Sequence, residues 1–275
     1  MTTHTARGRG AVSHLILAGF TVTALFPLLL VGLNSLKLST QVVQNPLSLP
    51  TSPAWTNFTE AWKYGHFGTG FVNSVLLTAT TVLIVLICSS LAGYALAGRR
   101  IRAQSAIIVY FMVAMTVPIQ LFLFPLYVGF AKLHLLGNVF AVGAVIAAMN
   151  MPLSVFLMRT FFLNVPAELE SAAKLDGAST WQTLRLVMLP IVSPGLITVS
   201  IIVGLNAWNE FLISSTFLQD NYTATLGYLS MNGTFSTDEG VMMAGAVVLV
   251  VPVLVVFVIL QRYVVDGLVN GAVKA

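Results

Sequence analysis

Residues 165–190 of the chain read VPAELESAAKLDGASTWQTLRLVMLP, a polar stretch between two long apolar runs. Proline is favoured in the first turn of a helix, and carboxylates near a helix N-terminus interact favourably with the helix dipole. Pro166, Glu168 and Glu170 therefore predict that a short helix begins here. Gly177 stands where this helix would end, because glycine readily adopts the backbone conformation that follows a last helical turn. The first half of the stretch thus predicts a helix closed by a glycine turn.

A second short helix is predicted after this turn. Ser179 and Gln182 have the spacing of a capping box, and the helix would run to Pro190. On the first helix, four residues share one face through their i, i+3, i+4, i+7 spacing, and its two alanines would let another backbone approach closely. We therefore expect helix, tight turn, helix, with one face free for a contact. The four residues of that face are Leu169, Ala172, Ala173 and Asp176.

The rest of the chain is strongly apolar. Of its 275 residues, 57% are hydrophobic and 8% are charged, whereas an average soluble domain carries about 25% charged residues. This composition excludes a water-soluble globule. A helix needs about 20 residues to cross the hydrocarbon core, and barrel strands alternate strictly in polarity, which these runs do not. We therefore predict an all-α membrane protein with six transmembrane helices. The six apolar runs are 12–33, 70–97, 105–130, 139–158, 191–218 and 241–260.

The distribution of positive charge predicts the orientation. Six spans place both termini on one side, and the segments of that side hold ten cations against three, Lys37, Lys63 and Lys132, on the other. Because cytoplasmic loops carry the excess of Lys and Arg, both termini are predicted to be cytoplasmic. The cations form no single basic face, so nucleic acid is not a predicted partner. The ten are Arg7, Arg9, Arg99, Arg100, Arg102, Arg159, Lys174, Arg185, Arg262 and Lys274.

The sequence lacks the motifs of several kinds of catalytic chemistry. It contains no Gly-Lys pair and hence no P-loop, so use of ATP would require a partner chain. The four histidines lie in different segments without metal-ligand spacing, and no Ser/His/Asp grouping shares one membrane depth. The one cysteine, Cys88, allows no internal disulfide and is expected to be packed. We predict no catalytic residue, no metal site and no bound cofactor in this chain.

Several segments together resemble a known family. The spaced pattern Ser171-Ala172-Ala173, Gly177 and Val187-Met188-Leu189-Pro190 is similar to the EAA signature of the permease subunits of bacterial ABC importers. The chain resembles the maltose-type carbohydrate permeases over nearly its whole length. This resemblance implies a type I ABC importer permease fold, sugar import by alternating access, and a place in the bacterial cytoplasmic membrane. Further similar segments are Asn73-Ser74, Trp208-Asn209-Glu210-Phe211 and the ending from Gln261 to Lys274.

The resemblance also implies partners. A homologous second permease subunit would complete the pathway, ABC ATPase subunits would hydrolyse ATP, and an extracytoplasmic sugar-binding protein would deliver the solute. Residues 165–190 would be the coupling loop that docks on the ATPase. One position departs from the signature: Ser171 replaces its glutamate, and Glu170 is about 100° away around the helix, so it does not simply substitute. The predicted docking residues are Glu170, Ser171, Ala172, Ala173, Asp176 and Gly177.

A polar cluster interrupts the fifth apolar run. Asn206, Asn209 and Glu210 lie beside Trp208, so they would face protein or water and not lipid. Two interpretations stay open: the cluster lines the path of the sugar, or it holds helices together. In the third run, two prolines remove backbone hydrogen bonds and predict a kink. They are Pro118 and Pro125.

The expected organisation has three parts. Residues 1–69 would form the N-terminal tail, the first span and an external segment, in which Phe58, Ala61 and Trp62 predict a short surface helix. Residues 70–260 would form the permease core, and 261–275 a cytoplasmic tail. Alternatives are a permease for a non-sugar solute, a stand-alone secondary carrier, and a scaffold or exporter component. The near absence of charge within the spans opposes the carrier, and the signature loop opposes the exporter.

Overall fold

The computed structural model describes residues 4–98, 101, 103–234 and 238–272, although not the side chains of 4–13, 233–234, 260 and 262–272. Four cations of the charge count, Arg99, Arg100, Arg102 and Lys274, lie outside the described residues. All regular secondary structure in the described part is helical. The chain divides into two compact units. Unit 1 comprises 1–68 and 227–252, and unit 2 comprises 69–226 and 253–275.

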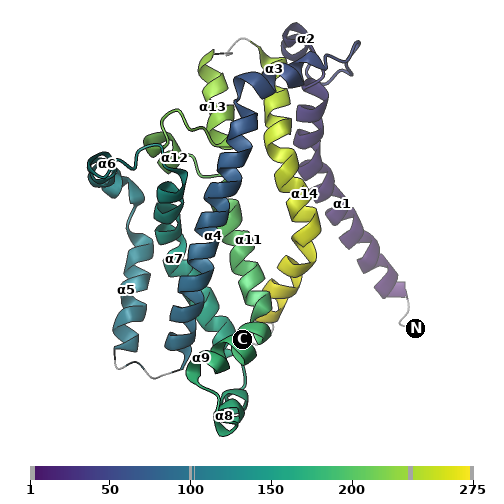
Figure 1. Ribbon diagram of the computed structural model, residues 1–275. Coiled ribbons are helices and arrows are strands. Elements are labelled where there is room, and N and C mark those ends of the chain that lie inside the picture. The colour runs from purple at the N-terminus through teal and green to yellow at the C-terminus, as the bar shows by residue number, and fades with distance from the viewer. Residues whose placement is uncertain (1–3, 99–100, 102, 235–237, 273–275) are drawn as a thin grey trace. The chain divides into compact units, whose positions relative to one another are not determined.

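Four helices are long and apolar enough to cross a membrane, and they confirm four of the predicted runs. The agreement follows from length, because each of these runs has at least about the 20 residues that a helix needs to cross the hydrocarbon core. Cys88 within the second of them is exposed, not packed as expected. The four helices are α1 (His4–Asn34), α4 (Phe67–Ala97), α7 (Val139–Leu163) and α14 (Glu239–Ala272) (Figure 1).

The third predicted span is not one continuous helix. α5 (Gln104–Thr116) ends before Pro118, and η1 (Ile119–Phe122) with α6 (Leu123–Lys132) follows at a bend of 88°. Proline lacks an N–H and restricts the residue before it to an extended backbone. Val117 is extended, with φ −81° and ψ 118°. The predicted kink is therefore a complete break at Pro118, whereas Pro125 lies within α6.

The fifth predicted span, 191–218, is also wrong as a single helix. Its main part is α11 (Ser193–Trp208), joined to the preceding helical segment at a bend of 74°. Pro194 lies in the first turn of α11, where its missing N–H costs nothing. After Trp208 the helix stops, and α12 (Leu212–Phe217) begins anew. In the described chain, therefore, the apolar spans number four, or up to six if each bent pair is one crossing.

In unit 2, α4 and α7 run parallel and touch at two levels. A Cβ on Gly143 would lie 3.1 Å from the Thr80 Cβ, and Thr81 Oγ1 donates to the Gly143 carbonyl at 3.0 Å. Thirteen positions further along α4, a Cβ on Gly93 would lie 2.9 Å from the backbone nitrogen of Arg159. Small residues let membrane helices approach this closely. The two helices therefore advance in the same direction.

α11 runs antiparallel to α7. Near the start of α11, a Cβ on Gly195 would lie 2.5 Å from the Phe161 ring, and near its end Asn206 contacts Asn150. Two apolar clusters fill the interior of unit 2, one at each end of these helices. The first includes Leu77, Val142, Ile146, Ile213 and Phe217, and the second includes Val85, Met158, Phe162, Leu184, Met188 and Val199.

At the end of unit 2 where α4 begins, the Asn73-Ser74 pair holds a non-helical segment. Asn73 Nδ2 donates to the Tyr222 carbonyl at 2.9 Å, and Ser74 Oγ accepts from the Ala224 N–H at 2.9 Å. A backbone group buried without a partner is costly, most of all in lipid. These side chains therefore satisfy the backbone just before α13 (Ala224–Thr234).

In unit 1, a buried lysine organises the segment after α1. The Lys37 side chain is fully buried, and its ammonium donates to Asn34 Oδ1 and to the carbonyls of Asn45 and Pro46 at 2.9–3.1 Å. The short α2 (Ser39–Gln44) lies between these residues. α3 (Thr56–Tyr64) confirms the predicted short helix, with Ala61 buried. Its place at a membrane surface stays a prediction.

Candidate functional site

The first half of residues 165–190 forms α8 (Ala167–Leu175), with Pro166 at its N-cap and not in its first turn. The helix ends in a Schellman motif, in which two N–H groups satisfy carbonyls of the last turn. The Gly177 N–H bonds the Lys174 carbonyl at 3.0 Å, and the Ala178 N–H bonds the Ala173 carbonyl at 2.9 Å. Gly177 has φ +80°, as the sequence predicts. A side chain in this conformation would cost about 1–2 kcal/mol.

The second half confirms the capping box. Ser179 Oγ accepts from the Gln182 N–H at 3.3 Å, and Gln182 Oε1 accepts from the Ser179 N–H at 2.8 Å. The helix that follows is not uniform, since its middle is π-helical, a local geometry that is frequent at functional sites. The sequence pattern did not show this. The segments are α9 (Thr180–Gln182), the π-helix η2 (Thr183–Met188) and α10 (Leu189–Ile191).

The predicted face of α8 divides into a buried part and an exposed part. Ala173 is 9% exposed, and α8 contacts η2, in which Leu184 and Met188 are buried. Leu169, Ala172 and Asp176 are exposed, and so is Gly177 in the turn that follows the helix. Ala173 therefore supports the packing between the two helices of the stretch, and the exposed four form the surface that a partner could reach.

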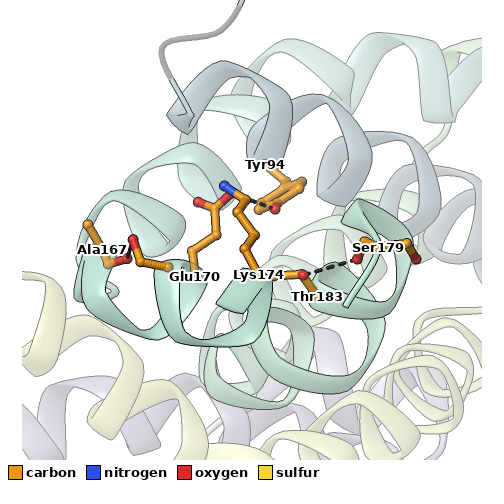
Figure 2. Close-up of polar contacts among 7 residues, drawn as sticks. Tyr94, Ala167, Glu170, Lys174, Ser179 and Thr183 are labelled. Atoms are coloured by element: carbon orange, nitrogen blue, oxygen red, sulfur yellow. Dashed lines mark hydrogen bonds and ion pairs between the residues drawn. The ribbon is translucent and has the colours of Figure 1, made fainter. Parts of the chain in front are cut away.

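Glu170 is directed toward Tyr94 of α4 (Figure 2). Its Oε1 accepts from the Tyr94 hydroxyl at 3.2 Å and from the Lys174 ammonium at 2.8 Å. The Glu170 side chain is 19% exposed and that of Lys174 43% exposed. Ser171, at the position of the signature glutamate, is exposed, and its hydroxyl bonds the Ala167 carbonyl of its own helix.

The Tyr94 ring is itself held in place. It packs edge-on against Phe162 of α7, with ring centroids 5.5 Å apart. Beside it, Gly93 is the point of close approach to Arg159, whose Nε donates to the Leu96 carbonyl at 3.2 Å. The loop is therefore bonded to the end of α4 at the place where α4 and α7 are most tightly joined.

The polar cluster of the fifth run lies near the far end of α11. Asn206 and Asn209 are exposed; the Asn206 amide donates to Asn150 Oδ1 at 3.1 Å, and the Asn209 amide to its own helix. The Trp208 ring lies 6.0 Å from that of Phe71. Its buried Nε1 has no hydrogen-bond partner in the part of the chain that the structure describes.

Glu210 stands apart from the other three. Its Oε1 accepts from the Ile213 N–H at 2.6 Å, and its Oε2 accepts from the N–H and the hydroxyl of Ser214 at 2.8 and 2.9 Å. These are the free donors at the start of α12, so the carboxylate caps that helix. The structure thus brings Asn206 and Glu210 into two different hydrogen-bond systems.

The sequence analysis did not identify Asn150 and Tyr94, the hydrogen-bond partners of Asn206 and Glu170. Asn150 could have been found, because a lone amide in the middle of an apolar run marks a polar contact at membrane depth. Tyr94 carried a weaker signal, since aromatic side chains are common near the ends of spans. Among the described residues, no group of three His, Cys, Asp or Glu side chains could hold a metal ion.

The apolar spans, two of them bent, define a membrane protein whose helix-turn-helix of 167–191 has an exposed face. Residues 86–269 match the family model described as the binding-protein-dependent transport system inner membrane component. The chain belongs to this family. It is thus the inner membrane, non-catalytic component of a bacterial ABC transport system, as the signature and the apolar runs predicted.

Named relatives align over nearly the whole chain. The arabinooligosaccharides transport system permease protein AraQ of Halalkalibacterium halodurans is 32% identical, covering 96% of this chain and 97% of its own. The trehalose transport system permease protein SugB of Mycobacterium tuberculosis is 30% identical over 91% and 93%. The crystal structure of a bacterial ABC transporter involved in alginate import matches the fold, with a TM-score of 0.76, 24% identity and coverage of 96% and 99%.

Proposed function

We propose that this chain is one of two permease subunits that import a carbohydrate across the cytoplasmic membrane. The observation that carries this proposal is the exposed helix-turn-helix of 167–191 in a chain of this family. Relatives of similar length are named for arabinooligosaccharides, diacetylchitobiose and trehalose transport, which favours a sugar over other solutes. A homologous second permease subunit completes the pathway, and an extracytoplasmic binding protein delivers the sugar.

ATP is used by a separate ATPase subunit that docks on the loop. Its contact surface includes Leu169, Ala172, Asp176 and Gly177, which are exposed. Ala172 and Gly177 have little or no side chain, so a partner's backbone could come close. Closure of the ATPase subunits on ATP would push α8, which is bonded to α4 through Tyr94, and so change the access of the pathway.

The helix directions of unit 2 support six crossings. α4 and α7 are parallel, so the chain between them must return once, and α5 with the bent segment after it is the available crossing. α7 and α11 are antiparallel, which places 164–192 at the end of the unit where α4 finishes. The excess of cations in the segments on this side supports a cytoplasmic location for it.

The orientation gives the first prediction. A reporter fused after Ala275, or inserted at 98–104, should report a cytoplasmic location, and one inserted at 219–240 an external location. The reason is the bias of ten cations to three between the two sets of segments. Paired alkaline phosphatase and green fluorescent protein fusions measure this. An external C-terminal fusion would contradict the predicted number of crossings.

The second prediction tests the function itself. The purified chain alone should show no saturable ATP binding, because it has no P-loop. When it is coexpressed with the products of neighbouring genes and reconstituted in nanodiscs, a second permease and an ATPase should copurify. Binding protein loaded with an arabinooligosaccharide, diacetylchitobiose or trehalose should then accelerate ATP hydrolysis.

Each alternative function has its own outcome in this experiment. Transport by the chain alone would indicate a secondary carrier. If non-sugar solutes accelerate ATP hydrolysis and none of the sugars does, the chain would be a permease for a non-sugar solute. Copurification of an ATPase without any stimulation by a binding protein would count against an importer.

A further inference from the structure

Glu170 of the proposed coupling loop is turned toward α4 of its own chain. Glu170 Oε1 lies 3.2 Å from the Tyr94 hydroxyl and 2.8 Å from the Lys174 ammonium, as Figure 2 shows. The bond from the ammonium is charge-assisted and therefore stronger than a neutral one, and the bond from the hydroxyl is long for its type. At 19% exposure, the Glu170 side chain is also largely shielded from competing water. The contact is therefore a bond between α8 and a membrane-spanning helix.

Both sides of this bond are held by further contacts. On the α4 side, Tyr94 packs against the buried Phe162, and Gly93 allows no side chain against Arg159. On the α8 side, the Schellman motif and the buried Ala173 fix the helix against η2. A force applied to α8 is thus transmitted to α4 for as long as the Tyr94–Glu170 bond holds.

We propose that Glu170 is a positioning residue that locks the coupling loop to α4, so that both move together when the ATPase closes. The inference rests on the proposed docking of the ATPase on this loop. It assigns Glu170 to holding the loop within the chain, and leaves contact with the ATPase to the exposed Leu169, Ala172, Asp176 and Gly177. Ser171, whose hydroxyl bonds its own helix, supplies no carboxylate in its place.

The test uses the complete complex in nanodiscs with spin labels on two exposed residues, Ala95 on α4 and Leu175 on α8. Cys88, the chain's one cysteine, is first changed to serine. Pulsed electron paramagnetic resonance then gives the label distance without nucleotide and with ATP and vanadate. With Tyr94 and Glu170 unchanged, the distribution of label distances should keep the same mean and width in both states. Tyr94→Phe and Glu170→Ala should each broaden the distribution and let it shift between the states.

Coupling is the second readout. Sugar taken up per ATP hydrolysed, with whichever of the three sugars stimulates the complex, should fall about fivefold, the lower end for coupling between sites. The double variant should be no worse than Glu170→Ala alone, because the Tyr94–Glu170 hydrogen bond that Tyr94→Phe removes is already absent there. Glu170→Gln, which keeps an acceptor for Tyr94, should recover most of the coupling. Glu168→Ala, at an exposed acid of the same helix, should change neither readout.

The outcomes separate this inference from the function on which it rests. If the unmodified chain copurifies with no ATPase, both the proposed function and this inference are wrong. If the complex assembles but Tyr94→Phe leaves distance and coupling unchanged, only the lock is wrong. If Glu170→Ala releases the ATPase while Tyr94→Phe does not, Glu170 is a docking contact and the positioning role is overturned.

Discussion

Gly177→Arg is expected to abolish copurification of the ATPase and sugar uptake while leaving the chain inserted in the membrane. Gly177 is exposed, and a Cβ there would meet nothing within 4 Å, so the chain itself has room for a side chain. The proposed ATPase surface lies on this exposed side. The arginine would then occupy the space that a docked partner needs. Membrane level, ATPase copurification and sugar uptake are measured on the same preparations.

Two variants separate backbone strain from the loss of docking. Gly177→Ala introduces the strain of a positive φ, about 1–2 kcal/mol, without the bulk, and should keep most of the uptake. Gly137→Ala is the matched control, because Gly137 has φ +78° against +80° for Gly177 and lies at the opposite end of unit 2. It should leave ATPase copurification intact. Normal uptake by Gly177→Arg would rule out docking at this turn.

The local structure of the loop could be predicted from the sequence because short-range rules determine it. The capping box of Ser179 and Gln182 and the left-handed Gly177 depend on residues only a few positions apart. The long helices were predictable for a similar reason, since the thickness of the bilayer sets their length. Ranges such as 70–97 and 139–158 therefore agree with α4 and α7 to within five residues at each end.

The sequence predicted a kink in the third run, but not the complete break at Pro118, the bend before α11 or the direction of Glu170. Hydropathy counts apolar residues without regard to backbone geometry, so the run through Pro118 appeared continuous although the helix breaks there. The partner of Glu170 is Tyr94, which is 76 positions away in the sequence. Only the parallel packing of α4 on α7 brings the two together. The sequence shows that the acid lies one position before the signature glutamate, but it does not show that Glu170 bonds Tyr94.

The hydrogen-bond partners of the polar cluster near the end of α11 could not be predicted from the sequence either. The sequence left open whether Glu210 lines the sugar path or holds helices together. In the structure its two carboxylate oxygens accept three hydrogen bonds from the first turn of α12. A group whose acceptors are engaged in this way has less capacity to bind a passing sugar. The geometry therefore favours the structural alternative, and a stability measurement can decide between them.

Glu210→Ala is expected to destabilise the chain by about 2 kcal/mol, because buried N–H groups lose a charged acceptor. The detergent-solubilised complex should melt at a lower temperature, and its membrane level should fall together with uptake. Glu210→Gln retains an acceptor and should lie between the alanine variant and the unchanged chain. Asn209→Ala is the neighbouring control: its amide bonds only the Leu205 carbonyl of its own helix among the contacts described, so its effect should stay within about 0.5 kcal/mol. Lost uptake by Glu210→Ala at unchanged melting temperature and assembly would instead place the carboxylate on the sugar path.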